Sequence, residues 1–321
     1  MVFRHVPVMR QEVAHYLNCR PGGVYVDGTL GGAGHARDIC ASIGADGLLI
    51  GIDQDPSAID HARENLLPHA PGALLFHDNF ANLPAILAHL KRSNVDGILL
   101  DLGLSLHQLE ASGRGFTFRG EEPLDMRMNP DEPTPAAKLV NTWDEAALTR
   151  LFRTYGEERW SRRIARQIVD QRRGHPIETN AQLVAAIQAA IPRRLQAKSA
   201  IHPATRVFMA LRIAVNRELE RLENFLSNVD VLLSPGGRLC IISFHSLEDR
   251  LVKRRMGALT RTCVCPPGVP VCRCSATATM RSLTRKVVRP SARELAGNPM
   301  ARSARLRAYE KRSIPGPGKL P

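Results

Sequence analysis

Glycines crowd the stretch at residues 24–35, which reads VYVDGTLGGAGH. It begins with β-branched and aromatic residues, as a buried strand does, and then places four glycines within seven residues. Because glycine has no Cβ, such a backbone can turn sharply and approach a ligand closely. A strand that leads through a glycine-rich turn into a helix is how α/β proteins build a nucleotide pocket. The stretch is therefore a candidate nucleotide-binding turn, with a tight turn that binds nothing as the alternative.

Two standard phosphate-binding motifs are absent from this turn. From Gly32 and Gly34, the third glycine of the G-x-G-x-x-G pattern would fall on Arg37. No Lys-Ser or Lys-Thr pair follows the glycines, so the Walker pattern is absent as well. The turn therefore needs support from its surroundings before it indicates a ligand.

An acidic residue stands at the distance that a ribose-binding group would need. Residues 48–52 form a second apolar run, and Asp53 follows it directly. An acid about 20 residues past the glycines, at the end of the second strand, can accept hydrogen bonds from ribose hydroxyls. The Asp55-Pro56 pair predicts that a helix begins there, with Asp55 as its N-cap. The spacing favours a nucleotide site over a simple turn or cap at Asp53.

Two more apolar runs extend the alternation of strands and helices. Residues 73–77 and 95–101 predict strands, and residues 83–90 between them are apolar at helical spacing. Nearly continuous apolar strands that alternate with helices indicate a parallel sheet covered on both faces. We therefore expect an α/β fold with a doubly wound sheet, whose ligands bind outside the carboxyl ends of the strands. Four residues fall at those ends: Asp27, Asp53, Phe80 and Asp101.

The middle of the chain lacks this rhythm. Residues 102–135 are rich in glycine, proline and charge, which predicts a long loop, and loops of this length are usually either functional or disordered. Between residues 134 and 200 no strand is legible, and three amphipathic helical stretches follow one another. The second stretch carries six arginines: Arg159, Arg162, Arg163, Arg166, Arg172 and Arg173. We expect a first core segment at 1–133, a helical insertion that serves as a substrate domain at 134–200, and a second core segment at 201–321.

The α/β rhythm resumes in the second core segment. Apolar spacing predicts one long helix over about 208–231, a turn at 234–237 and a strand at 238–244. Ser243 and His245 lie at the end of this strand, on the ligand side. A Ser/His pair is typical of nucleophilic catalysis, but the G-x-S-x-G elbow is absent. A hydrogen-bonding or substrate-positioning role is therefore favoured.

Positive charge is concentrated in the last quarter of the chain. The net charge is +13, and residues 250–321 hold 17 basic and 2 acidic residues, so the rest of the chain is close to neutral. A localised basic region is typical of a protein that binds a polyanion, and in a soluble protein this is usually nucleic acid. A solvated basic tail is the alternative.

Four of the seven cysteines form two C-x-C pairs: Cys263 with Cys265, and Cys272 with Cys274. Four thiolates could bind a structural zinc ion, but zinc ribbons usually use wider C-x₂₋₄-C pairs. A cluster of reduced thiols is the alternative, and we assign no metal ligand. The odd cysteine count suits a reducing cytosol better than a disulfide framework.

Targeting signals are also missing from the sequence. No apolar run approaches the roughly 18 residues of a membrane span. The first residues, MVFRHVPV, contain no apolar signal-peptide segment. We therefore expect a cytoplasmic protein without membrane contact.

The motifs occur together and in an order that resembles one bacterial family. They are HVPVM at 5–9, DGTLGGAGH at 27–35, GIDQDP at 51–56, DLGLS at 101–105, PLDMRM at 123–128, the region 205–218, and SFHSLEDR at 243–250. Over about residues 1–315 the chain resembles the ribosomal RNA small subunit methyltransferase H family.

The resemblance implies a class I methyltransferase fold, which is a Rossmann-like doubly wound sheet, with an inserted all-α domain. It implies S-adenosylmethionine as cofactor and N4 of a cytidine in the decoding region of 16S rRNA as target, with the small ribosomal subunit as partner. Residues that match the family's cofactor set are Ala33, Gly34, His35, Asp53, Phe80, Asp101 and Gln108. Ala33 stands where many members have glycine, and Leu106-His107 where many have Ser-Pro.

The catalytic group is inferred from the chemistry of the target amine. Many amino-methyltransferases carry an Asp- or Asn-Pro-Pro-aromatic loop after the fourth strand, and residues 101–105 contain no proline pair. Our hypothesis is that Asp101, or a hydroxyl at Ser105 or Ser243, accepts a hydrogen bond from the target amine, with His245 nearby. The basic C-terminal region and the arginines of the insertion would bind the RNA backbone.

Three alternatives remain at this point. A nicotinamide-dependent oxidoreductase would share the turn and the ribose acid, but should show the full G-x-G-x-x-G pattern. A non-catalytic RNA-binding assembly protein would leave the turn and Asp53 without a role. The third alternative is a methyltransferase that acts on DNA or another RNA, and only the family resemblance distinguishes that substrate from 16S rRNA. The sequence leaves the oligomeric state open, with a homodimer among the options.

Overall fold

The computed structural model describes residues 7–70, 72–196, 201–265, 271, 274 and 277–313. The chain folds into two compact units. The first, which we call the sheet unit, consists of Met1–Gly103 and Leu219–Pro321. The second, the helical unit, is the intervening Leu104–Glu218. Each unit has its own hydrophobic core.

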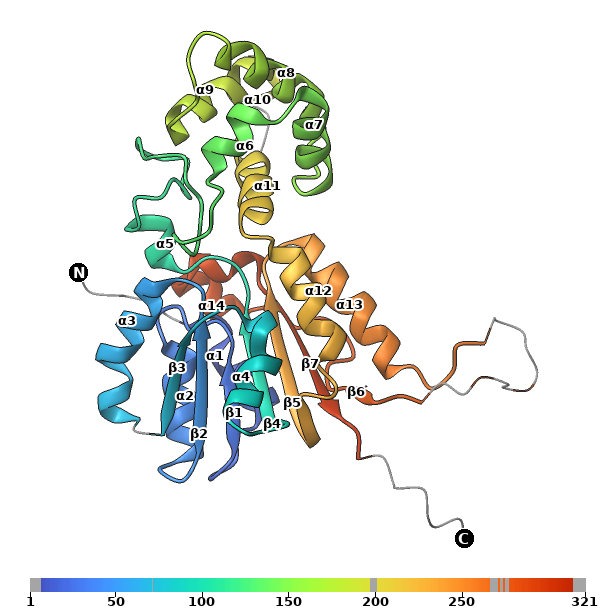
Figure 1. Cartoon of the computed structure of the whole chain (residues 1–321). Coiled ribbons are helices and arrows are strands. Elements are labelled where there is room, and N and C mark those ends of the chain that lie inside the picture. The colour runs from blue at the N-terminus through green and yellow to red at the C-terminus, as the bar shows by residue number, and fades with distance from the viewer. Residues whose placement is uncertain are drawn as a thin grey trace. The chain divides into compact units, whose positions relative to one another are not determined.

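The sheet unit is built on a seven-stranded sheet in the order β3-β2-β1-β4-β5-β7-β6 (Figure 1). The first five strands in this order are parallel, β7 is antiparallel to β5, and β6 is antiparallel to β7. The predicted doubly wound α/β fold is confirmed. The strands are β1 (Val24–Asp27), β2 (Leu48–Asp53), β3 (Ala73–His77), β4 (Val95–Asp101), β5 (Leu233–Ser243), β6 (Met280–Ser282) and β7 (Arg305–Lys311).

Helices cover both faces of the sheet because neighbouring strand residues point to opposite sides. Tyr25 packs with α1, α2 and α3 on one face, and Val26 packs with α4, α12 and α13 on the other. The helices of this unit are α1 (Arg10–Leu17), α2 (Gly34–Ile43), α3 (Pro56–Asn65), α4 (Leu83–His89), α12 (Glu218–Asn228), α13 (Ser246–Thr260) and α14 (Ala292–Gly297), with 3₁₀ turns η1 (Leu67–His69), η2 (Phe80–Asn82) and η3 (Pro299–Ser303).

The strand order reverses between β1 and β4. From β1 the chain adds β2 and β3 on one side, and then crosses to the other side of β1 to form β4. In open α/β sheets, ligands bind outside the carboxyl ends of the strands at such a switch point. Here those ends are Asp27 and Asp101, so the fold places two carboxylates where a ligand is expected.

Two features of the sheet differ from the sequence prediction. The region 250–321, interpreted as a basic region, also supplies β6 and β7, and Leu306 and Ala308 of β7 are fully buried. The predicted turn at 234–237 lies inside β5, where the register shifts between the pairs Val95–Leu233 and Gly97–Arg238, as in a β-bulge.

The helical unit contains α5 (Leu106–Glu110), α6 (Ala136–Thr142), α7 (Glu145–Thr154), α8 (Ser161–Arg172), α9 (Asn180–Ala190), α10 (Arg193–Gln196) and α11 (Thr205–Val215). The three predicted helical stretches correspond to α7, α8 and α9. The compact unit is wider than the predicted insertion at 134–200, because flanking segments complete its core. Leu124 and Met126 from the long loop and Leu211 from α11 are buried in that core.

The predicted long helix at 208–231 is instead two helices, α11 and α12. The break falls at Asn216 and at Arg217, whose φ of 51° is left-handed. The side chain of Asn216 is buried; it accepts the Met128 N–H at 2.7 Å and donates to Met126 O at 2.8 Å. These bonds to a distant loop fix the break, and the apolar spacing of the helices gives no sign of them.

Asn216→Ala should destabilise the helical unit by about 2–4 kcal/mol, because it leaves a buried backbone N–H and carbonyl without partners. Both tryptophans, Trp143 and Trp160, lie in this unit, so urea denaturation followed by tryptophan fluorescence reports on it directly. The exposed Gln188→Ala, on α9 of the same unit, is the matched control and should change the free energy of unfolding by less than about 0.5 kcal/mol. Equal losses in the two variants would show that the Asn216 bonds do not hold the break.

Candidate active site

The glycine-rich turn after β1 is packed against two other elements. A Cβ on Gly28 would lie 2.4 Å from Leu100 Cδ2 and 3.0 Å from Phe80 Cβ, so a larger residue would have to displace the Leu100 side chain and press on Phe80. The Leu30 N–H donates to Ile52 O at 3.1 Å, which holds the turn against the end of β2. The turn therefore lies across the carboxyl ends of β1, β2 and β4.

Helix α2 begins at the end of this turn without a side-chain cap. Its N-cap, Ala33, has a left-handed φ of 56° and offers no side-chain oxygen. An uncapped helix N-terminus presents backbone N–H groups and a partial positive charge, which suit a ligand carboxylate. The conformation also explains why glycine is favoured at this position, since a Cβ makes left-handed φ costly.

Asp53 joins the turn to the end of β2. Its Oδ2 accepts the Gly31 N–H and its Oδ1 accepts the Asp55 N–H, both at 2.8 Å. Burial raises the pKa of Asp53 to about 6, although these two N–H groups oppose the rise. A carboxylate has about four acceptor positions, so Asp53 can position the turn and still accept ribose hydroxyls.

Two buried carboxylates lie at the switch point. The Asp101 N–H donates to Thr29 Oγ1 at 2.6 Å, and the Thr29 N–H donates to Asp27 Oδ1 at 3.1 Å. The other oxygen of Asp27, Oδ2, and the Oδ1 of Asp101 are buried and have no hydrogen-bond partner among the residues that the structure describes. His35 Nε2 lies 3.8 Å from Asp101 Oδ2. The carboxyl edge of the sheet, where β1 and β4 end, therefore holds acceptor atoms that a cationic or donor-rich ligand would satisfy.

The charge state of this pair depends on its surroundings. Burial raises the pKa of Asp27 to about 7. Burial raises the pKa of Asp101 well above its ordinary value, and the carboxylates of Asp27, Glu248 and Glu294 raise it further. A bound cation would lower both pKa values, because it stabilises the ionised carboxylates.

Phe80 lies beside the glycine-rich turn, just past the end of β3. It begins the 3₁₀ turn after β3, and Asn79 Oδ1 caps this turn by accepting the Ala81 N–H at 3.0 Å. The Phe80 ring is 7% exposed and lies edge-on to Phe225, with 5.7 Å between centroids. Little of Phe80 is therefore exposed where a nucleobase could contact it.

Two of the predicted polar residues, Ser243 and His245, also have structural contacts. Ser243 Oγ donates to Arg305 O at 3.4 Å, which links the end of β5 to β7. His245 is the N-cap of α13: its Nδ1 accepts the Glu248 N–H at 3.4 Å, and Glu248 Oε2 accepts the His245 N–H at 3.3 Å. The sheet pairs Asp101 with Ile242, so Ser243 follows directly on the strand partner of Asp101.

The remaining predicted residues, Ser105 and Gln108, belong to the helical unit. They form a capping box for α5. Ser105 Oγ accepts the Gln108 N–H at 3.2 Å, and Gln108 Oε1 accepts the Ser105 N–H at 3.0 Å. Both side chains are thus engaged in starting the helix.

Three acidic residues near Asp101 were not assigned to the site from the sequence. Asp27 was placed at a strand end without a role. Glu248 was quoted only as part of a motif, and Glu294 lies in the region interpreted as basic, where its Oε1 accepts the Met9 N–H at 2.6 Å. Only Asp27 carried a usable signal, because it ends the strand before the glycines.

Comparison with known proteins identifies the family. The sequence model of the MraW methylase family matches residues 2–312. The chain belongs to this family. Three relatives are each named "Ribosomal RNA small subunit methyltransferase H". The relative from Desulfosudis oleivorans is 54% identical over 311 residues, 97% of this chain and 100% of its own length. The relative from Desulforapulum autotrophicum is 54% identical over 96% of this chain and 98% of its own length. The relative from Geobacter sulfurreducens is 52% identical over 97% of this chain and 100% of its own length.

Membership in the MraW methylase family makes the chain a methyltransferase that uses S-adenosylmethionine. The edge described above fits this cofactor. Its sulfonium and ammonium groups are cationic, and the unpartnered oxygens of Asp27 and Asp101 are buried acceptors. Its carboxylate suits the uncapped start of α2, and its ribose hydroxyls suit the open acceptor positions of Asp53.

Asp27→Asn should flatten the pH dependence of stability. Because the pKa of Asp27 rises from 3.8 to about 7 on folding, the folded protein holds a proton between these values that the unfolded chain has released. The free energy of unfolding therefore falls as pH rises through this window, by at most roughly 4 kcal/mol at about 1.4 kcal/mol per pKa unit. The variant should thus gain stability relative to the wild type as pH rises.

Urea denaturation followed by circular dichroism, at several pH values between about 4 and 8, measures this difference in the cofactor-free protein. The control is Asp60→Asn, since the Asp60 side chain is 66% exposed, and it should leave the pH dependence unchanged. If the free energy of unfolding of Asp27→Asn changed with pH in the same way as that of the wild type, the assignment of a buried, protonated Asp27 would be refuted.

Proposed function

We propose that the chain transfers the methyl group of S-adenosylmethionine to the exocyclic N4 amine of a cytidine in small-subunit ribosomal RNA. The observation that carries the proposal is the match over nearly full length, at 54% identity, to relatives named as small subunit rRNA methyltransferases. The acidic edge at the switch point supports it independently. In this reaction the N4–CH₃ bond forms, the S–CH₃ bond breaks and the amine loses a proton.

Cofactor binding is assigned to the ends of the first three strands. Ala33, Gly34 and His35 would hold the methionine part through the backbone at the start of α2. Asp53 would accept the ribose hydroxyls, and Phe80 would lie beside the adenine. When bound, the cofactor supplies an electrophilic methyl group on a cationic sulfur.

Asp101 is the best-supported acceptor for the target amine. The lone pair of the cytosine amine is delocalised into the ring, so the nitrogen attacks only when it is held in line and a group accepts its hydrogen bond. Asp101 Oδ1 is buried with no hydrogen-bond partner among the described residues. A cationic group held beside Asp101 would lower the pKa of its carboxyl and favour the ionised form that accepts a hydrogen bond from the amine.

The alternative polar groups are less suited to this role. The Ser243 hydroxyl donates to Arg305 O, and the Ser105 hydroxyl accepts the Gln108 N–H. The His245 ring serves as the cap of α13. We therefore propose that Ser243 and His245 shape the edge beside Asp101, and that Ser105 and Gln108 position the start of α5.

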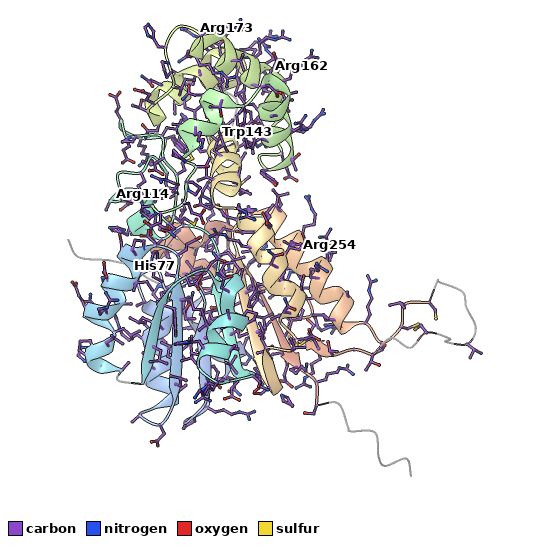
Figure 2. The ribbon with its side chains drawn as sticks, viewed as in Figure 1. His77, Arg114, Trp143, Arg162, Arg173 and Arg254 are labelled. Atoms are coloured by element: carbon purple, nitrogen blue, oxygen red, sulfur yellow. The ribbon has the colours of Figure 1, made fainter. Side chains whose placement is uncertain are left out.

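The arginines within α8 and at its two ends are the proposed RNA contacts of the helical unit. Most of these side chains are exposed, and Arg162 and Arg173 project from the unit in Figure 2. Arg159 and Arg163 lie over the Trp160 ring, with 5.5 and 5.4 Å from guanidinium carbon to ring centroid. Arg172 differs: it is half-buried and donates to Val140 O at 2.5 Å, so its role is structural. Phosphate contacts of this kind give affinity without reading sequence.

Several arginines of the basic C-terminal region are paired with carboxylates, so fewer of its cations are available to RNA. Arg307 donates to Asp249, Arg281 to Glu310 and Arg254 to Glu223. Exposed cations of this region, such as Lys286 and Arg289, are the better candidates for RNA contact.

The proposed substrate is made and assembled in the bacterial cytoplasm, in agreement with the expected localisation. None of the helices in the described part of the chain has the length and apolar character that a membrane crossing needs.

Asp101→Asn should lower the single-turnover rate of methyl transfer roughly a hundredfold at saturating cofactor, because the amide cannot accept the proton. The assay uses S-adenosylmethionine with a tritiated methyl group, offered in parallel with naked 16S rRNA, small ribosomal subunits and DNA. Mass spectrometry of digested RNA then maps the methylated base. Asp60→Asn is the control and should keep the wild-type rate.

If the wild-type protein transferred the methyl group to DNA, or to an RNA position other than cytidine N4, the proposed substrate would be wrong. A wild-type rate in Asp101→Asn would leave the substrate intact and remove Asp101 as acceptor.

The double variant Arg159→Ala/Arg163→Ala should weaken RNA binding several-fold. The slope of log K against log salt should fall by about 1 for each lost phosphate contact. Filter binding at several salt concentrations measures both quantities. Arg63→Ala, an exposed arginine paired with Asp60 on α3, is the matched control. An unchanged slope in the double variant would place the RNA elsewhere.

A further inference from the structure

Three cysteine thiols converge after the end of α13. The Sγ atoms of Cys263, Cys265 and Cys274 all lie within 4.8 Å of one another. They come from both C-x-C pairs, and eight residues separate Cys265 from Cys274 in the sequence. The fourth cysteine, Cys272, lies outside the described residues, so the argument rests on these three.

The spacing of these thiols matches a tetrahedral thiolate site. With Zn–S bonds of about 2.3 Å and tetrahedral angles, neighbouring sulfurs should be about 3.8 Å apart. The Sγ atoms of Cys263 and Cys274 are 3.8 Å apart. All three thiols lie in an exposed or half-buried segment, so an ion can reach them from solvent.

Backbone groups also point at the sulfurs. The Val264 N–H donates to Cys274 Sγ at 3.3 Å, and the Cys265 N–H donates to Cys263 Sγ at 3.4 Å. Such N–H bonds stabilise a sulfur that carries negative charge and orient it toward a metal. The second pair therefore bonds to the backbone of the first, as a shared ligand would require.

Burial disfavours the thiolate form of the other cysteines that the structure describes. Burial raises the pKa of Cys19 to about 12 and that of Cys40 to about 11, which keeps both as neutral thiols. Cys240 is fully buried in β5. Only the cluster after α13 combines access, convergence and N–H donors among the described residues.

We propose that Cys263, Cys265 and Cys274 bind one zinc ion as thiolates. Each thiol releases its proton on binding and donates an electron pair to Zn²⁺, with no oxidation or reduction. The ion ties the residues that follow α13 to those that precede β6. It thereby fixes a basic segment that contains Arg261, on the same unit as the proposed active site.

The test is the metal content of the full-length protein, purified under reducing conditions without a metal-binding tag. We expect about one zinc ion per chain by inductively coupled plasma mass spectrometry. Cys263→Ser and Cys274→Ser should each weaken zinc affinity by more than about tenfold, measured by competition with a chromogenic chelator. Cobalt bound in place of zinc should give the intense d–d bands of a tetrahedral thiolate site.

Cys40→Ser is the matched control and should keep the full zinc content. Circular dichroism checks that each variant folds, and the cobalt spectrum of the wild type needs no variant at all. Reduced wild-type protein that takes up no zinc would overturn the proposal, as would a Cys263–Cys274 disulfide in the protein as isolated. Loss of zinc in Cys40→Ser would place the metal elsewhere. None of these readouts requires methyl transfer, so their failure is separate from that of the proposed function.

Discussion

Burial of two carboxylates at the switch point of the sheet is the constraint on which the site depends. Asp27 and Asp101 each leave one buried oxygen without a hydrogen-bond partner among the described residues. An unsatisfied buried polar atom costs about 1–3 kcal/mol, and more when it is charged. A cationic ligand bound beside these two oxygens would offset that cost, so the carboxyl edge of the sheet suits such a ligand.

The rest of the site holds these carboxylates and the glycine turn in register. Thr29 bonds to Asp27 through its N–H and to Asp101 through its hydroxyl, so one residue fixes the ends of β1 and β4 together. Asp53 bonds to the turn and to the start of α3 in the same way. Because each of these hydrogen bonds joins the turn to a different strand, a shift in any one strand would move the backbone of the glycine-rich turn.

The core strands and their terminal acids were predictable because both follow from local patterns. Apolar runs identify buried strands, and an acid that ends such a run lies at the ligand edge. The strand β7 was missed because its alternating basic residues, Arg305 and Arg307, were counted as surface charge. In the fold both lie against Asp249, at 3.6 and 2.7 Å. Pairing between residues far apart in sequence determines that outcome, and periodicity does not report it.

The candidate site residues also differ in whether local sequence or contacts between distant residues determine their place. Asp53 and Asp101 were predictable from position alone, whereas the capping roles of His245, Ser105 and Gln108 depend on which backbone N–H each side chain meets. The raised pKa of Asp101 likewise depends on Glu248 and Glu294, which no spacing rule connects to it. This dependence has a functional consequence under the proposed mechanism. Burial and these acidic neighbours favour the protonated form of Asp101, and a cation bound beside it would favour the ionised form, which is the proton acceptor in the proposal. The acidic surroundings would thus couple the charge of the acceptor to the presence of a cationic methyl donor.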